Sequence, residues 1–359
     1  MKTVAHFPLL CAAALFALAA CKKNDAVSPQ ANAAQADLQM AAEENGWHLP
    51  LTVKTIAGSV SESGYVDGKG KEARFSFADG IDVMDDGTLY VADRYNDKIR
   101  KITPDGVVST VNIPKNNEGH ELLGPSTVRV QKNGTINILT YDVYFVTGDK
   151  IWIIKPNGDV LTPKYKTSPD NTLQNLYTYN DLQRDPYSDF LLIGGIFRGY
   201  TGMRSAGVIE RFEINDNKIG TNAFHTPIEA FDSHTANTRI TSFFSGYNGV
   251  KYIVIDQKQI FKLTKSGVFE RIYKNLSFQR ITSIVANKDS RTLYIAELGK
   301  LMAITNGKLV FLAGQQKPHD GGDGVGSSAD VGAHKLALSK DEGTLYFTNN
   351  SSVRKMLLR

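Results

Sequence analysis

Gly87-Thr88-Leu89-Tyr90-Val91-Ala92-Asp93 is the stretch that decides the fold, because a copy of its beginning stands near the other end of the chain. Gly343-Thr344-Leu345-Tyr346 lies 256 positions later, and the same register aligns Asp67-Gly68-Lys69-Gly70 with Asp323-Gly324-Val325-Gly326. Two segments are not expected to match in one register over so many residues by chance. The chain therefore contains a structural repeat.

The clearest unit of this repeat predicts four strands. Runs of β-branched and aromatic residues alternate with turns rich in Asp, Gly and Pro. The predicted strands are Gly80–Met84, Thr88–Ala92, Lys98–Thr103 and Val107–Asn112. Further copies of the second strand are Thr292–Glu297, Thr135–Leu139, Phe190–Gly194 and Tyr252–Asp256. Six units of four antiparallel strands predict an all-β, six-bladed β-propeller.

The repeat also predicts how the ring closes. The first five blades are expected at Ala73–Asn112, Leu123–Lys164, Leu176–Gly220, Ile240–Tyr273 and Ile281–Ala313. Blade six starts near Asp330 and reaches the C-terminus with only three strands. We expect Leu51–Ala57 to be its missing outer strand, because this N-terminal strand precedes blade one as Lys308–Ala313 precedes blade six. Pairing the two ends would leave no open edge between blades.

Blade one resembles the NHL repeat family. The matching elements are Tyr90–Asp93, Ile99–Ile102 and Pro104–Gly106, preceded by Gly64–Gly70 and Ala73–Phe75. Blade six also matches the repeat well, whereas blades two to five match only in their order of strands and turns. The proline that usually stands just before the inner strand is present as Pro125, whereas Ala78 and His334 stand at its positions in blades one and six. The resemblance implies a six-bladed propeller that binds a protein or ligand, and some related propellers are lyases or calcium-dependent lactonases.

The first fifty residues predict export and anchoring. A positive start and an apolar run too short to span a bilayer indicate a signal peptide, residues 1–20, removed on export. Leu18-Ala19-Ala20-Cys21 resembles the lipobox of bacterial lipoproteins, which implies lipidation of Cys21; the alternative is an ordinary secretory signal. Residues 21–50 are expected to be a flexible tether, in which Gln35–Glu44 could form one short helix, and residues 51–359 the propeller. Lys22-Lys23-Asn24-Asp25 resembles the start of Bacteroidota lipoproteins, so we expect an outer-membrane lipoprotein that faces the periplasm or the cell surface.

Composition excludes several functional classes. Forty-one Lys and Arg against 37 Asp and Glu give a net charge of +4, with no long cationic run, so nucleic-acid binding is not expected. Both cysteines, Cys11 and Cys21, lie outside the propeller, so it has no thiol nucleophile. The sequence contains no G-x-S-x-G elbow, P-loop or dinucleotide motif. We therefore assign no catalytic residue and expect no cofactor in the leading interpretation.

Aromatic and arginine side chains in the loops are the candidates for ligand binding. In a propeller, the loop that enters each blade and the loop between its second and third strands lie on one face, around the mouth of the central channel. The candidates there are Tyr95, Tyr141, Tyr144, Phe197, Arg198, Tyr200 and Arg204. They suit a sugar, a peptide or a protein partner in the envelope. The alternative is that they pack the long loops onto the propeller.

Four polar residues at matching positions after the second strand form a candidate metal site. Asp93, Asp256, Glu297 and Asn349 carry the oxygen ligands that Ca²⁺ prefers. In the alternative interpretation they accept hydrogen bonds from backbone N–H groups and close turns. The sequence therefore predicts a ligand-binding envelope propeller, with a calcium-dependent lactonase- or lyase-like enzyme as the alternative.

Overall fold

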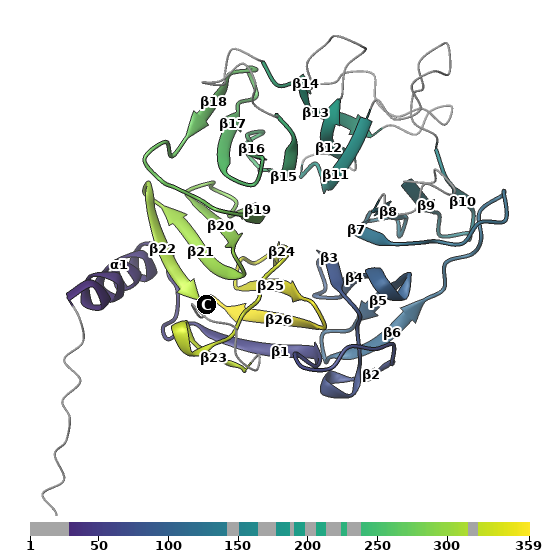
Figure 1. Ribbon diagram of the computed structural model, residues 1–359, viewed down its shortest axis with the longest axis horizontal. Coiled ribbons are helices and arrows are strands. Elements are labelled where there is room, and N and C mark those ends of the chain that lie inside the picture. Colours follow the sequence, from purple (N-terminus) through teal and green to yellow (C-terminus); the bar gives the residue numbers. More distant parts are fainter. Residues whose placement is uncertain are drawn as a thin grey trace, which may run out of the picture.

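Six antiparallel β-sheets stand around a common axis in the computed structural model (Figure 1). The structure describes residues 29–141, 151–163, 177–186, 190–197, 206–212, 224–227, 238–314 and 322–359. The innermost strands of neighbouring sheets contact one another around the ring. The prediction of an all-β, six-bladed β-propeller is confirmed.

Each blade runs outward from the axis in chain order. Blade one consists of β3 (Ala78–Val83), β4 (Leu89–Asp93), β5 (Lys98–Ile102) and β6 (Val107–Val111), with the short β2 (Gly68–Lys69) outside them. Blade two consists of β7 (Pro125–Val130), β8 (Ile136–Thr140), β9 (Ile151–Ile154) and β10 (Val160–Leu161). Blade three consists of β11 (Tyr177–Arg184), β12 (Leu191–Phe197), β13 (Ala206–Phe212) and β14 (Phe224–His225).

The second half of the ring repeats this order. Blade four consists of β15 (Ile240–Ser245), β16 (Lys251–Ile255), β17 (Gln259–Leu263) and β18 (Phe269–Ile272). Blade five consists of β19 (Ile281–Ala286), β20 (Thr292–Glu297), β21 (Lys300–Thr305) and β22 (Lys308–Ala313). Blade six consists of β24 (Leu336–Leu338), β25 (Thr344–Asn349), β26 (Ser352–Leu357) and β1 (Thr52–Gly58), with β23 (Gly324–Val325) outside them. Short 3₁₀ helices among the described residues are η1 (Gly70–Glu72), η2 (Arg94–Asn96) and η4 (Gly326–Ser328).

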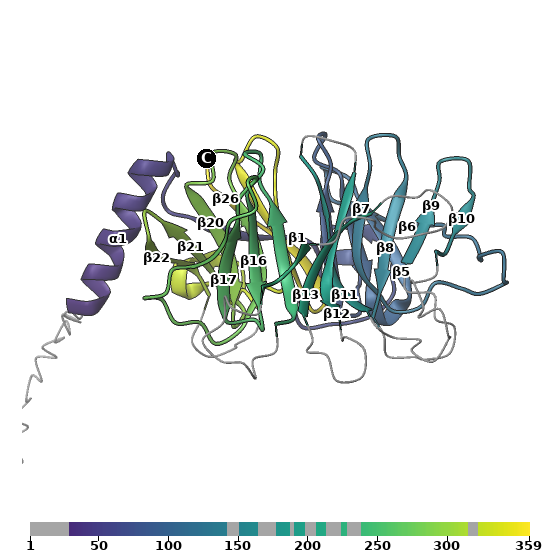
Figure 2. The same cartoon turned by 90° about the horizontal axis from the view of Figure 1, so that it is seen from above.

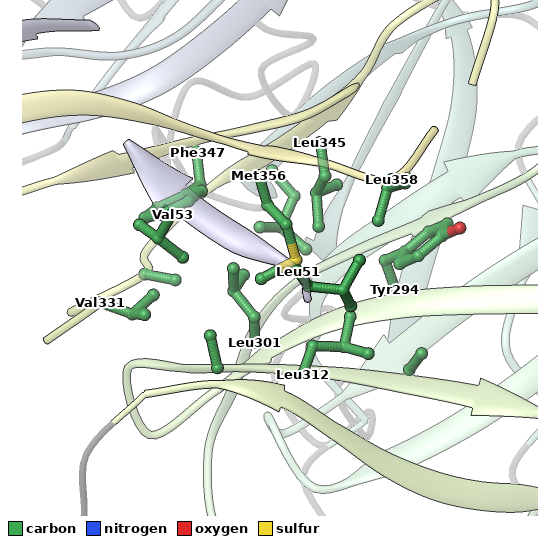
Figure 3. Close-up of a cluster of buried hydrophobic side chains, with 14 of the residues drawn as sticks. Leu51, Val53, Tyr294, Leu301, Leu312, Val331, Leu345, Phe347, Met356 and Leu358 are labelled. Atoms are coloured by element: carbon green, nitrogen blue, oxygen red, sulfur yellow. The ribbon is translucent and has the colours of Figure 1, made fainter. Parts of the chain in front are cut away.

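The start and the end of the propeller chain share the sheet of blade six. Strand β1 pairs antiparallel with β26, with Val53 opposite Met356. Figure 3 shows the buried cluster at this junction, where Leu51 and Val53 lie among side chains of β25, β26 and blade five. Leu51 is 2% exposed and Val53 is fully buried. Burial of apolar surface therefore holds the two ends of the chain together.

Part of the predicted tether is a packed helix. Helix α1 (Pro29–Asn45) lies against the outside of the ring next to β22 (Figure 2). Ala41 and Ala42 at its end are buried, and the Trp47 indole Nε1 donates to the Tyr294 hydroxyl at 3.1 Å. The prediction of a flexible tether over residues 21–50 is corrected for residues 29–50, because these small and aromatic side chains fit onto blade five. Among the described residues no helix is long and apolar enough to cross a membrane.

Two faces of the ring follow from this topology. The loops that enter the blades and those that join second to third strands lie on one face, here called the loop face. The turns that join first to second strands lie on the opposite face, here called the turn face. Arg94, in the loop between β4 and β5, lies on the loop face, and the turn between β24 and β25 brings Gly343 to the turn face beside Leu358 of the C-terminal end.

Candidate functional site

The loop face carries a cluster of side chains at the channel mouth, contributed by blades six, one and two. Arg94 stands at its centre. Its Cζ lies 3.7 Å from the ring centroid of Tyr141, 5.3 Å from that of Phe77 and 5.7 Å from that of Tyr95. We call Phe77, Asp79, Arg94, Tyr95, Tyr141 and His334 the Arg94 cluster.

A buried carboxylate fixes the arginine in this position. Asp79 is the second residue of the inner strand β3 and is 5% exposed. Its Oδ2 lies 3.4 Å from Arg94 Nη1, and its Oδ1 lies 3.0 Å from His334 Nδ1. The backbone N–H of Arg94 also donates to the carbonyl of Phe77. The cluster is thus anchored on the rigid inner strand of blade one rather than on loop backbone alone.

Two tyrosine rings of the cluster are open to solvent. Tyr95 is 66% exposed and Tyr141 is 54% exposed, although both contact the Arg94 guanidinium. Phe77 packs beneath Tyr95, with ring centroids 5.0 Å apart. A face of aromatic rings around a positioned cation can hold the apolar face of a sugar ring or an aromatic side chain. The hydroxyls, guanidinium and imidazole can hydrogen-bond to polar groups of the same ligand.

The sequence prediction identified Tyr95 and Tyr141, and the structure brings these two together. Phe197 ends strand β12 on the loop face. Tyr144, Arg198, Tyr200 and Arg204 lie outside the described residues, as does the predicted lipidation site Cys21. The predicted roles of these five residues therefore stay predictions.

The sequence analysis missed Phe77, Asp79, Arg94 and His334. One signal was present: Ala78 and His334 occupy the positions where the repeat usually has proline. At these two positions the chain departs from the repeat, and the neighbours of Ala78 together with His334 form the cluster. The proline is also missing from blades three to five, so this departure alone did not distinguish the candidate site from the other blade entrances.

The four candidate metal ligands lie at matching positions, as expected, but they do not converge. Each stands at or just after the end of a second strand, one strand away from the axis. Among the described residues, which include all four, no group of three or more His, Cys, Asp or Glu side chains is placed to hold a metal ion.

The Asp93 carboxylate is occupied by donors of its own blade. Its Oδ1 accepts from the Ser76 backbone N–H at 2.7 Å, and its Oδ2 accepts from Asn96 Nδ2 at 2.8 Å and from Arg100 Nη1 at 2.7 Å. Burial raises the pKa of Asp93 against the opposing effect of these donors. A fully buried carboxylate with three donors serves the architecture of the blade.

Two other members of the set make contacts of the same kind. Glu297 Oε1 accepts from the backbone N–H of Gln279, in the loop that enters blade five, and Asn349 Nδ2 donates to the carbonyl of Val331, in the loop that enters blade six. Burial raises the pKa of Asp256, which favours its neutral form. The Asp93 and Glu297 contacts fit the turn-closing interpretation, in which the side chain accepts from a backbone N–H group, whereas Asn349 donates to a carbonyl instead. Within the described residues the four side chains share no site for Ca²⁺.

Comparison with known proteins gives structural neighbours only. No protein-family model matches the sequence, and no curated protein matches it. An auxiliary nutrient binding protein from Bacteroides ovatus is 14% identical, with a TM-score of 0.57 over 87% of this chain and 78% of that one. A second, from Bacteroides thetaiotaomicron, is 14% identical, with a TM-score of 0.59 over 85% of this chain and 76% of that one.

A gluconolactonase from Xanthomonas campestris has the same fold. It is 9% identical, with a TM-score of 0.58 over 89% of this chain and 93% of that one. Identities this low show the shared fold alone. The chain is therefore a six-bladed β-propeller with binding proteins and an enzyme among its structural neighbours, and the Arg94 cluster is the candidate site that the described part of the loop face presents.

Proposed function

We propose that this protein is a lipid-anchored cell-envelope propeller of the NHL type that binds a glycan on its loop face. The observation that carries the proposal is the pair of exposed rings, Tyr95 and Tyr141, held on either side of Arg94 at the channel mouth. The structural likeness to auxiliary nutrient binding proteins supports a binding role. A peptide or a partner protein is the other ligand that such a surface would accept.

The chemistry of the cluster favours a sugar. A pyranose ring has an apolar face that stacks on tyrosine and a rim of hydroxyls that hydrogen-bond to polar groups. Asp79 neutralises much of the Arg94 charge at 3.4 Å, so the surface does not demand an anionic ligand. The stacking partners and the hydrogen-bond donors stand on a scaffold that needs little rearrangement, which lowers the entropic cost of binding.

The anchor and the compartment complete the proposal. Leu18–Cys21 matches a lipobox, and this match supports attachment of lipid to Cys21 and residence at the outer membrane. Metabolic labelling with a radioactive fatty acid tests the anchor. We expect label in the wild-type protein and none in Cys21→Ser, and equal labelling of the two would overturn the lipoprotein assignment.

A glycan array tests the binding site. The protein is produced without residues 1–20 and with Cys21→Ser, and compared with a variant carrying Tyr95→Ala and Tyr141→Ala. We expect binding to at least one oligosaccharide class, weakened at least about tenfold in the double variant, because aromatic residues dominate such contacts. Tyr65→Ala is the matched control, since Tyr65 is 52% exposed and lies 5.1 Å from Arg100 in another cation–π contact.

Three results would contradict the proposal. If Tyr65→Ala weakened glycan binding as strongly as the double variant does, the loss would be a general effect of removing exposed tyrosines. Glycan binding that the double variant retains would place the site elsewhere. Binding to a peptide library with none to the glycan array would replace the glycan by a peptide ligand.

A further inference from the structure

A second cavity opens on the turn face, opposite the Arg94 cluster. It has a volume of about 460 Å³, and all six blades contribute to its wall through the ends of their inner strands and the turns that follow. Pockets that hold small molecules commonly have volumes of about 300–1,000 Å³. The cavity is therefore large enough for a small organic ligand, and it shares no residue with the Arg94 cluster.

Charged groups form the wall contributed by blades one to three. Arg184 Nη2 lies 2.7 Å from Asp82 Oδ1, and Arg184 Nη1 donates to the carbonyl of Val130 at 3.0 Å. Arg129 Nη1 donates to the carbonyl of Ile81 at 2.8 Å. These contacts fix both guanidinium groups. The Arg184 side chain remains 32% exposed, so it presents a positioned cation to the cavity.

The wall contributed by blades four to six is largely apolar. Phe244 lines it from blade four, Val285 and Ala286 from blade five, and Leu336 and Ala337 from blade six. Val285, Ala286, Leu336 and Ala337 belong to the hydrophobic core and are only 2–8% exposed. Most of the apolar surface open to the cavity therefore comes from Phe244, Tyr247 and Leu338. The cavity therefore combines an apolar patch on blades four to six with charged groups on both sides of the ring, because blades five and six also contribute Lys288, Lys340 and Glu342.

The acidic groups of the cavity already have partners. Asp82 is paired with Arg184 and also accepts from the Val130 backbone N–H at 2.8 Å. Asp85 Oδ2 lies 2.6 Å from Lys340 Nζ, and Glu342 accepts from the Lys288 backbone N–H. Asp185 interacts electrostatically with the partly buried Lys251.

Two lysine side chains at the rim lack such partners. Lys132 and Lys288 are exposed, and within the described residues neither ammonium group takes part in a hydrogen bond or an ion pair. Lys288 Nζ lies 6.0 Å from the ring centroid of Tyr247, at the edge of the same cavity. Blades two and five, which carry these lysines, stand opposite each other in the ring (Figure 1). Two positive charges without a carboxylate partner therefore stand on opposite sides of the opening.

We propose that this cavity is a second binding site, for a small amphipathic anion. The acidic head of the ligand faces Arg184 and Lys132, and its hydrocarbon body lies on Phe244, Tyr247 and Leu338. Charge-assisted hydrogen bonds select the anion, and burial of apolar surface supplies most of the affinity. This site is independent of the glycan site proposed on the loop face.

Three eight-carbon probes that differ only in the head group test the proposal. Octanoate, octanamide and octylammonium are titrated by calorimetry into the protein from residue 21 onward with Cys21→Ser, in buffer without detergent. We expect octanoate to bind and the other two to bind at least about tenfold more weakly, because hydrogen bonds to a charged group exceed those to a neutral one. Added salt should weaken octanoate binding, because exposed charges are screened.

Variants locate the binding. Lys132→Gln combined with Lys288→Gln should weaken octanoate binding at least about fivefold. Lys155→Gln combined with Lys274→Gln is the matched control, since it removes the same charge from exposed lysines outside the cavity. The control variant should bind octanoate like the parent protein.

Several outcomes would overturn the proposal. No binding at millimolar octanoate, or equal binding of octanamide, would exclude an anion site. If both lysine double variants lost octanoate affinity equally, the effect would come from the overall charge of the protein and not from this cavity. Tyr95→Ala with Tyr141→Ala should leave octanoate binding unchanged, which separates this site from the glycan site; a loss there would overturn the independence of the two sites.

Discussion

Blades one and six contain the same buried arginine clamp. Arg100 Nη2 lies 2.6 Å from Asp67 Oδ1 and Nη1 lies 2.7 Å from Asp93 Oδ2; in blade six, Arg354 Nη2 lies 3.1 Å from Asp323 Oδ1. Both arginine side chains are fully buried, and both also donate to backbone carbonyls. Each clamp ties an Asp-Gly-x-Gly loop to the outer part of its blade. The matching glycine-rich loops are therefore architecture rather than a ligand site.

The two blades differ after their second strands. Blade one continues from Asp93 through Arg94–Asp97, whereas blade six continues from Asn349 through only Asn350–Ser351. The two extra residues give blade one the loop that carries Arg94 and Tyr95. What the two blades share therefore builds the scaffold, and the longer loop of blade one supplies Arg94 and Tyr95, the centre of the candidate binding surface.

The largest expected effect comes from breaking the two clamps. Arg100→Met should lower the free energy of unfolding by about 3–5 kcal/mol, because it leaves the Asp93 charge buried without its cation. Arg354→Met should cost less, about 1–3 kcal/mol, because Asn349 is neutral and Asp323 is partly exposed. Urea unfolding of both variants measures the difference. Equal losses would contradict the contrast between the two clamps.

A smaller effect is expected when blade one is given the blade-six residue. Asp93→Asn should cost about 1–3 kcal/mol, because Arg100 loses its fully buried charged partner. The metal content, measured by elemental analysis without chelator, should not change, and EDTA should leave the melting temperature of the wild-type protein unchanged. If the wild-type protein contained near-stoichiometric calcium and Asp93→Asn lost it, the result would instead support the metal-dependent alternative.

The smallest effect concerns the acid stability of the blade-one clamp. Burial raises the pKa of Asp67, but hydrogen bonds from Arg100 and Thr110 outweigh it and hold this pKa below its ordinary value of 3.8. A lowered folded-state pKa stabilises the protein above the unfolded-state pKa, and this contribution disappears as the pH falls through the folded value. The stability difference between wild type and Asp67→Asn, followed by urea unfolding, should therefore shrink below about pH 4. A difference independent of pH would contradict this role of Asp67.

The fold could be predicted because propeller strands recur in sequence. The register that joins blades one and six identified Leu51–Ala57 as a strand, and β1 (Thr52–Gly58) pairs with β26. The strands of blade four span Ile240–Ile272, close to the predicted Ile240–Tyr273. A short helix at Gln35–Glu44 could be suggested from the sequence, but the packing of helix α1 could not, because its alanines show no strong amphipathic pattern and are buried only by contact with blade five.

The sites were less predictable, because they depend on contacts between blades. Tyr95 and Tyr141 stood out as aromatic residues in loops, but their meeting at Arg94 requires blades one and two to be neighbours. Asp93 stands at the same position of the repeat as the acidic residues of other blades, but the sequence did not show that its carboxylate is paired with Arg100. The turn-face cavity gave no signal, because its lysines lie in ordinary turns of the repeat.

The measurement that tests the central claim most directly is glycan binding by a blade-one variant with the blade-six loop. Arg94–Asp97 is replaced by Asn-Ser, the sequence of Asn350–Ser351. We expect a folded propeller that is about 1–3 kcal/mol less stable, because Asp97 no longer accepts from the Gly124 N–H and Asn96 no longer donates to Gly64, and no glycan binding. Glycan binding equal to that of the wild-type protein would contradict the claim that this loop forms the binding surface.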